Sequence, residues 1–437
     1  MKQNFYLTFL LSILMTFSLS AVAKSPRHYD VRAFYGDKQG NKVVVINVKK
    51  MKLIDKVATE GLTPYPVDRA GYLDKVYAIT RGSSSVDVID AETLENFGVI
   101  QLNHKPRSGE SYNSRLGLTL IAGADKPLTS VIDVVSDMVV AEAGVDTSTT
   151  QTRDNGGSIS SGHPAWLTKN RFVVIDRANR FIQLWGIKKI REGISLDYRW
   201  EVTLLDTANT PTAVHHFLHR QIATTEPKGE KRIFYALAEG KASNDNGGSI
   251  SPAILELRLT ASDRLRLVGQ IDLPGNASEM SAHHADLHPD GQHIYVGSAE
   301  GKLFVIDRRS KELVSTIETG LGTGHTRFVP SRMMAIVTNH HDTFVTVINT
   351  ETHSKITDIE VSGSKINGEI LQSHTNYVSP DNSFYYAFAS DNGIFYEINL
   401  QSLSVSRTLN TGGVPVQGSF INWDSFSYSA ASSSTGM

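Results

Sequence analysis

Histidines recur in this sequence at points where a short polar stretch leads into an apolar run. The five segments are SGHPAWL with His163, AVHHFLH with His215 and His216, SAHHADL with His283 and His284, GTGHTRF with His325, and LQSHTNY with His374. Neutral imidazole is a good ligand for copper and zinc, whereas calcium and magnesium prefer oxygen ligands. If the fold brings these segments together, they predict a copper or zinc site.

The elements that would position the histidines repeat along the chain. Eight copies of a strand-turn-strand pattern occupy residues 43–57, 85–100, 128–144, 181–205, 253–273, 302–319, 344–361 and 394–409. Most copies are about 40 to 50 residues apart, and apolar and polar residues alternate within them. A repeat of this length built from short strands is typical of a β-propeller with four strands per blade. We predict an all-β propeller of eight blades, with seven as the alternative if the irregular unit at 112–144 is miscounted.

Both ends of the repeat region predict how the ring closes. HYDVRAFYGDKQGNKVVVIN lacks a first strand, and VPVQGSFINW near the end supplies a spare one, so the two should share a blade. Several copies are preceded by a second recurring segment, HPDGQHIYVGSAEG (288–301) or SPDNSFYYAFASDNG (379–393). Segment and hairpin together resemble the YVTN-type repeat of bacterial propellers, which implies the fold but not the function.

The order of strands in a blade determines which loops meet. The first strand lines the central channel, and successive loops fall alternately on the two faces, so the loop entering strand one shares a face with the loop between strands two and three. The histidine segments all enter a first strand, and His341, with His340 and Asp342 beside it, lies in a loop of the second kind. The predicted metal ligands at this mouth are His163, His215, His216, His283, His284, His325, His341 and His374.

Other histidines are predicted to have no role. His288 and His293 flank a turn on the opposite face, His353 lies in an outer hairpin, and His28 is near the N-terminus. A single histidine is more often a solvated or hydrogen-bonded side chain than a ligand. For the histidines at the mouth, the competing interpretation is that the repeats share a histidine that forms a hydrogen bond with a loop carbonyl. That interpretation explains neither the doublets nor the three blades without a histidine.

The blades without a mouth histidine carry cations instead. TPYPVDRAG contains Arg69, ESYNSRLG contains Arg115, and the loop LNHKPRSG contains His104 and Lys105. We predict that these four residues hold a small anionic substrate beside the metal, since cations and hydrogen-bond donors stabilise negative charge. The alternative is that they are ordinary surface residues.

Bulk properties narrow the class of protein. Lys2, an apolar run and Ala21-Val22-Ala23 predict a signal peptide over residues 1–23 and export to a bacterial periplasm. No later apolar run predicts a membrane span. The propeller is expected over residues 24–424, with a flexible tail at 425–437. A net charge of -2 gives no field that would attract nucleic acid, and the absence of cysteine excludes thiolate centres, iron–sulfur clusters and c-type haem attachment.

A propeller mouth lined by histidines of successive blades resembles the copper-cluster domain of nitrous oxide reductase and, in its single-domain layout, periplasmic thiocyanate dehydrogenase. In the latter family such histidines, including an adjacent pair, hold copper ions, and a Lys and a His lie beside the substrate anion. The resemblance implies copper ligands at His163, His283, His284, His325 and His374, with His215 or His216 between them. It also implies substrate contacts from His104 and from Lys105 or Arg69. Two departures are the short span after His163, where such an enzyme needs extra acidic groups, and the absence of a cysteine-based electron-transfer centre.

Three functions remain open at this point. The first is a copper-dependent oxidoreductase acting on a small anion, with a periplasmic electron-transfer protein as partner. The second is a carrier that passes zinc or copper to a delivery partner, and exported propellers that do this for zinc exist as a family. The third is a non-enzymatic propeller that binds another protein. Five or more imidazoles converging at a closed mouth would favour the enzyme, and an open site of three or four ligands would favour the carrier.

Overall fold

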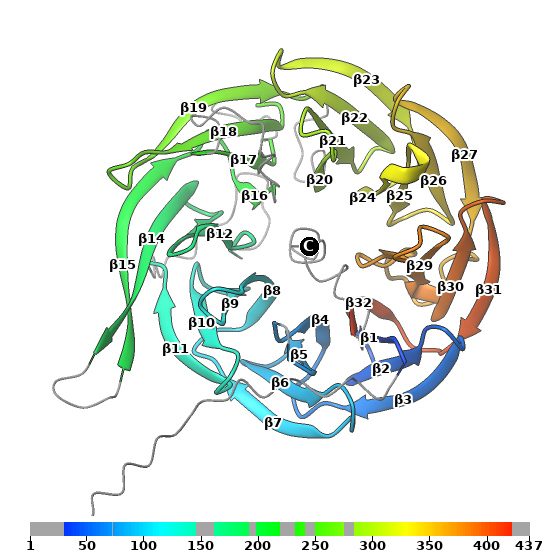
Figure 1. Cartoon of the computed structure of the whole chain (residues 1–437), viewed down its shortest axis with the longest axis horizontal. Helices are drawn as coiled ribbons and strands as arrows, with labels where there is room; N and C mark the ends of the chain where they lie inside the picture. Colours follow the sequence, from blue (N-terminus) through cyan, green and yellow to red (C-terminus); the bar gives the residue numbers. More distant parts are fainter. Residues whose placement is uncertain are drawn as a thin grey trace, which may run out of the picture.

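The described strands form a closed ring of blades. The computed structural model describes residues 30–71, 73–145, 161–191, 198–218, 232–240, 250–274 and 284–421. These residues contain 32 strands in eight antiparallel four-stranded sheets, arranged around a central channel (Figure 1). The prediction of an eight-bladed all-β propeller is confirmed. The predicted signal peptide and C-terminal tail, and His28 and His283, lie outside the described residues.

The blades are numbered here in ring order, with the strands of each given from the channel outwards. Blades 1 to 4 consist of β32(Pro415–Ile421), β1(Arg32–Asp37), β2(Lys42–Asn47), β3(Lys52–Ala58); β4(Pro64–Arg69), β5(Lys75–Thr80), β6(Ser85–Asp90), β7(Asn96–Gln101); β8(Pro106–Asn113), β9(Leu118–Gly123), β10(Thr129–Asp133), β11(Met138–Ala143); and β12(Ala165–Thr168), β13(Arg171–Asp176), β14(Phe181–Arg191), β15(Tyr198–Asn209). Blades 5 to 8 consist of β16(Val214–Phe217), β17(Ile233–Ala238), β18(Ala253–Leu259), β19(Leu265–Asp272); β20(His284–Leu287), β21(His293–Ser298), β22(Lys302–Asp307), β23(Glu312–Glu318); β24(Thr323–Val329), β25(Met334–Asn339), β26(Phe344–Asn349), β27(Ser354–Glu360); and β28(Tyr377–Val378), β29(Phe384–Ala389), β30(Ile394–Asn399), β31(Ser404–Asn410). Short 3-10 turns, η2(Pro330–Arg332) and η3(Ser390–Asn392), join strands in blades 7 and 8.

The eight sequence copies correspond to the outer two strands of the eight blades, from β2–β3 to β30–β31. Burial explains why their patterns differ. Middle strands such as β22 are buried along almost their whole length, because neighbouring blades cover both faces. Outer strands such as β27 are mostly exposed, with buried or half-buried positions in between, since water meets one side. Long apolar runs therefore mark the interior of a blade and alternation marks its rim.

The hydrophobic core is divided among the spaces between blades. Each of the eight buried apolar clusters in the described residues joins two adjacent blades, as where Leu237 and Ile254 of blade 5 pack with Phe304 and Ile306 of blade 6. Burying one such side chain stabilises a fold by about 1.5–3 kcal/mol. Neighbouring blades therefore fix one another's position, which gives the loops at the channel a firm base.

The predicted ring closure is present in blade 1. β32 pairs antiparallel with β1, with Ala33 opposite Phe420, and so supplies the strand nearest the channel. Asp37 secures the junction, because its Oδ1 accepts the backbone N–H of Val414 at 2.9 Å. Lys38 adds an ion pair to Glu369 of blade 8.

Strand direction defines two faces of the ring. The mouth is the face on which each first strand begins and on which strands two and three are connected. The opposite face carries the turns between strands one and two. β20 has four residues, so its two ends lie about 10 Å apart. Among the described residues, no helix is long and apolar enough to cross a bilayer.

Candidate metal centre

Among the described residues, seven imidazole rings gather at the mouth. They come from five consecutive blades, 4 to 8, and six of them stand at or just before a first strand. The seventh, His340, follows β25 directly. We call this group the mouth cluster, and it consists of His163, His215, His216, His284, His325, His340 and His374.

The rings of the mouth cluster form one continuous arc. Successive ring centroids along it lie 5.1 Å (His163–His215), 5.3 Å (His215–His216), 5.7 Å (His216–His284), 3.6 Å (His284–His325), 6.1 Å (His325–His340) and 4.2 Å (His340–His374) apart. Side chains more than 200 residues apart in sequence thus lie within one shared space, since His163 and His374 belong to the same arc.

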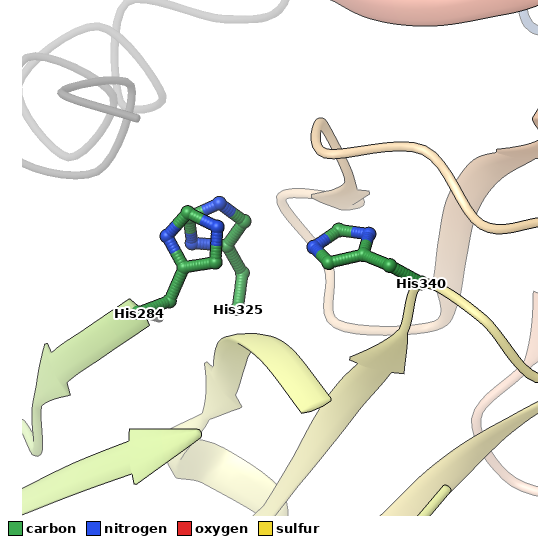
Figure 2. A group of neighbouring side chains, drawn as sticks. All are labelled: His284, His325 and His340. Carbon is green, nitrogen blue, oxygen red and sulfur yellow. The ribbon is translucent and has the colours of Figure 1, made fainter. Parts of the chain in front are cut away.

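The tightest part of the arc is a group of three. His284, His325 and His340 each offer one ring nitrogen, and these nitrogens all lie within 4.8 Å of one another. Figure 2 shows the three rings converging, His284 from the start of β20, His325 from β24 and His340 from the end of β25. Nitrogens bound to one tetrahedral ion lie about 3.3 Å apart, given metal–nitrogen distances of about 2.0 Å. Small side-chain rotations therefore suffice for one ion to reach all three.

Burial keeps His340 neutral, as a metal ligand must be. Its ring is 2% exposed, and burial lowers its pKa from 6.5 to about 4 although a hydrogen bond to the Gln372 carbonyl opposes the shift. That bond joins Nδ1 to the Gln372 oxygen at 3.0 Å, so Nδ1 carries the proton and Nε2 carries the lone pair. Gly324 makes room for the ring, because a Cβ there would overlap His340 Nε2.

His215 is held by a buried carboxylate. Its Nδ1 lies 3.2 Å from Glu239 Oε1, and Glu239 is also paired with Arg177. Burial first, and then the positive charges of Arg107 and Arg177, hold the pKa of His215 well below its ordinary value. The contact with Glu239 is therefore a hydrogen bond from a neutral ring rather than an ion pair. A carboxylate behind an imidazole in this way orients the ring and raises its basicity as a ligand.

Asp286 positions the cluster without joining the three-nitrogen group. Its Oδ2 accepts the backbone N–H of Thr326 at 2.7 Å, which ties β20 to β24 beside His325. Burial raises the pKa of this carboxyl to about 6, against the lowering effect of the Thr326 N–H. Asp286 thus fixes the spacing between two of the histidine-bearing strands.

The structure brings together six of the eight predicted metal ligands, His163, His215, His216, His284, His325 and His374. His283 lies outside the described residues. His341 is exposed, and its neighbour His340 turns inward instead. The backbone explains the difference: His340 donates to Gly322 and accepts from Leu371, which directs its side chain toward the channel.

The four residues predicted to face the substrate lie in or between blades 2 and 3, outside the five blades that carry the mouth cluster. His104 is buried inside blade 3, with Nε2 2.9 Å from Ser130 Oγ and Nδ1 3.2 Å from the Lys105 carbonyl. The Lys105 side chain is exposed. Arg69 is the last residue of β4, and Arg115 lies in the turn between β8 and β9, so both stand toward the opposite face.

Sequence reasoning missed two charged residues that lie beside the cluster, Arg177 and Glu239, and did not count His340 among the ligands. Arg177, Glu239 and His340 each follow a second strand directly, after β13, β17 and β25. This is the position that the alternation of loops assigns to the mouth, so examining it in every repeat would have found Arg177 and Glu239 as well as the loop of His340. Arg107, at the start of β8, donates to the Ser161 carbonyl two residues before His163. It supplies the positive charge nearest the arc from blade 3.

The comparisons with known proteins show the fold alone. No protein-family model and no curated protein matches the sequence. The solved structure of the dihydro-heme d1 dehydrogenase NirN in complex with DHE is similar with a TM-score of 0.62 and 12% identity, covering 96% of this chain and 79% of that one. Apo AztD from Citrobacter koseri is similar with a TM-score of 0.58 and 11% identity, covering 90% of this chain and 98% of its own. The computationally designed Ika8 protein has a TM-score of 0.53 and 11% identity, over 82% of this chain and 91% of its own.

Proposed function

We propose that this protein is an exported copper-dependent oxidoreductase that acts on a small anion at the mouth of the propeller. The observation that carries the proposal is the number of imidazoles in one arc. A tetrahedral ion needs about four ligands, and the mouth cluster offers seven. A site for more than one metal ion requires additional imidazoles in contact with the four that bind the first ion.

The chemistry of the donors favours copper. The cluster is made of imidazole nitrogens, and the nearest buried carboxylate, Glu239, is engaged by Arg177 and His215. Nitrogen ligands of this kind bind copper more tightly than other divalent first-row metals. Buried, neutral rings such as His215 and His340 keep their lone pairs available below neutral pH. The resemblance to thiocyanate dehydrogenase supports the same metal.

An anion fits the charge of the site. Arg107 lies close enough to His215 to depress its pKa, and bound metal ions would add further positive charge. Copper would supply the redox chemistry, while Arg107 would attract and orient the anion. The electrons removed from the substrate would pass to a separate periplasmic electron-transfer protein, since the chain has no cysteine to hold an iron–sulfur or thiolate copper centre.

Metal stoichiometry tests the proposal. After copper reconstitution, elemental analysis should give two or more coppers per chain, and the His284→Ala/His325→Ala double variant should lose them. The matched pair is His340→Ala, expected to lose copper, and His341→Ala, expected to keep it, because the neighbouring rings differ in burial. Copper-loaded protein should reduce an electron acceptor when small anions such as thiocyanate are added. Wild type that binds no copper, or binds it equally after His340→Ala, would overturn the proposal.

A carrier is the second candidate, favoured by the compact group of His284, His325 and His340. Three nitrogens within 4.8 Å are enough for one exchangeable ion. This function predicts one zinc or copper per chain, transferred rapidly to a competing chelator or a delivery partner, with no anion-dependent electron transfer. Stoichiometry and release rate together separate the carrier from the enzyme.

A further inference from the structure

A second group of histidines lies at the other end of blade 6, on the opposite face. His288 follows β20, and His293 begins β21, with the turn Pro289-Asp290-Gly291 between them. One ligand atom from each of His288, Asp290 and His293 lies within 4.8 Å of the other two. β20 separates this group from His284 of the mouth cluster by about 13 Å.

The two oxygens of Asp290 have different tasks. Oδ1 accepts the backbone N–H of Gln292 at 2.6 Å and that of His293 at 3.1 Å, which shapes the turn. Oδ2 faces the rings, 2.9 Å from His288 Nδ1 and 2.7 Å from His293 Nδ1. The carboxylate is thus held in place by the backbone while one oxygen stays directed at both imidazoles.

The equivalent turn of blade 8 shows that the histidines are not needed to form it. There Ser379, Asp381 and Phe384 occupy the positions of His288, Asp290 and His293. Asp381 Oδ1 again accepts a turn N–H, from Ser383 at 3.1 Å. Because the same turn folds with Ser379 and Phe384 in blade 8, His288 and His293 are not needed to form the turn in blade 6.

A third imidazole reaches the group from blade 7. His353, in the turn between β26 and β27, has its ring centroid 4.5 Å from that of His293. Its Nδ1 lies 2.6 Å from the Tyr295 hydroxyl, which fixes the orientation of the ring. His353 is not among the three residues whose ligand atoms lie within 4.8 Å of one another, so it would have to move toward them to complete a tetrahedral set.

We propose that His288, Asp290, His293 and His353 form a second metal site, suited to zinc, that joins blades 6 and 7 on the opposite face. Oδ2 and the two Nδ1 atoms would have to separate by only about 0.5 Å to reach the roughly 3.3 Å spacing of tetrahedral ligands. His288 Nδ1 also accepts the Asp290 N–H at 3.2 Å, and a metal ion bound to this nitrogen would replace that hydrogen bond. A mixed nitrogen and oxygen set without sulfur suits zinc or cobalt better than copper(I).

The site is tested with zinc and cobalt ions on the full chain. The key variant is His288→Ser/His293→Phe, which gives blade 6 the turn residues of blade 8 and should fold normally. It is compared with wild type and with the mouth variant His284→Ala/His325→Ala. We expect the turn variant to bind one zinc fewer than wild type while its mouth metal is unchanged, and the mouth variant to retain the opposite-face zinc.

The mouth variant also isolates the second site for spectroscopy and stability. It should show the visible absorption of tetrahedral Co²⁺, and zinc should raise its thermal midpoint, since a ligand that binds only the folded state stabilises it. Both effects should disappear when His288→Ser/His293→Phe is added. The proposal is overturned if the turn variant binds as much zinc as wild type, or if the mouth variant binds no zinc. A failure of the mouth cluster to bind copper would leave these outcomes unaffected.

Discussion

The two faces of the ring at blades 6 and 7 carry histidines in opposite physical settings. At the mouth, His284 and His325 are 6% and 3% exposed, and their neighbours are held by backbone carbonyls and a buried carboxylate. On the opposite face the side chains of His288 and His293 are each 17% exposed and share the half-exposed Asp290. The comparison teaches that burial favours the neutral form of a histidine, since it lowers the pKa of both His215 and His340 at the mouth.

We expect a larger loss of stability from removing Glu239, the buried carboxylate of the mouth, than from removing Asp290, the exposed carboxylate of the opposite face. Glu239→Ala leaves the buried Arg177 guanidinium without its carboxylate, which typically costs about 3–5 kcal/mol of stability. Denaturant unfolding of the metal-free protein measures the loss. The Arg177→Met/Glu239→Leu double variant should lose much less. Equal losses of stability in the single and double variants would show that the unpaired Arg177 is not the cause.

Acid should affect the two faces in different pH ranges. His340 has a pKa of about 4 in the folded protein and about 6.5 when unfolded, so it favours folding above pH 6.5 and that stability is lost as the pH falls toward 4. The free energy of unfolding should fall by on the order of 3 kcal/mol, since each pKa unit corresponds to about 1.4 kcal/mol. His340→Gln should flatten the stability profile between pH 6.5 and 4.

The opposite face should respond only in stronger acid. His288, Gln292 and His293 hold the pKa of Asp290 well below its ordinary 3.8, although burial opposes the shift. A depressed carboxyl stabilises the fold above pH 3.8, and this contribution is lost as the pH falls below that value. Asp290→Asn should therefore remove the loss of stability below pH 3.8 and keep the His340 step between pH 6.5 and 4. Disappearance of that step would show that the two faces are not independent.

A smaller effect tests the packing of the mouth. Gly324→Ala places a Cβ against His340 Nε2, and overpacking of this kind typically costs about 1–3 kcal/mol. Copper content should fall with it, since the displaced ring is one of the three converging ligands. Unchanged metal content and stability would show that His340 can move without consequence.

The smallest effect is expected on the opposite face. Gly291 has a φ of +70°, and Asn382 takes the same place in blade 8 with a φ of +57°. Asn tolerates this left-handed conformation, so Gly291→Asn should change stability by less than about 0.5 kcal/mol. Zinc binding at His288 and His293 should persist in this variant.

The repeat predicted the fold and much of the site. Because every blade uses the same strand order, His163, His284 and His374 could be assigned to one mouth before their distances were known. The choice between His340 and His341 could not be made, because adjacent side chains point in opposite directions and backbone bonds to Gly322 and Leu371 decide between them.

The sequence did not predict on which face of the ring the cations lie, because it does not fix where the first strands end. Arg69 ends β4 and Arg115 follows β8, so each stands a whole strand away from the mouth. Sequence patterns locate strand ends only to within a few residues. The triad of His215, Glu239 and Arg177 depends on contacts across blades 4 and 5, which no local pattern records.

The closing strand gives the molecule an order of assembly. Val416 of β32 accepts the backbone N–H of His374 at 3.0 Å, so the last of the described strands holds the last histidine of the arc in place. A chain emerging from its N-terminus carries β1 to β3 early but cannot complete blade 1 until residue 421 has arrived. The arc is therefore finished only when the whole chain is present on one side of any membrane it crosses. If the arc binds a metal as proposed, the compartment in which β32 docks would decide which metal ions are available to it.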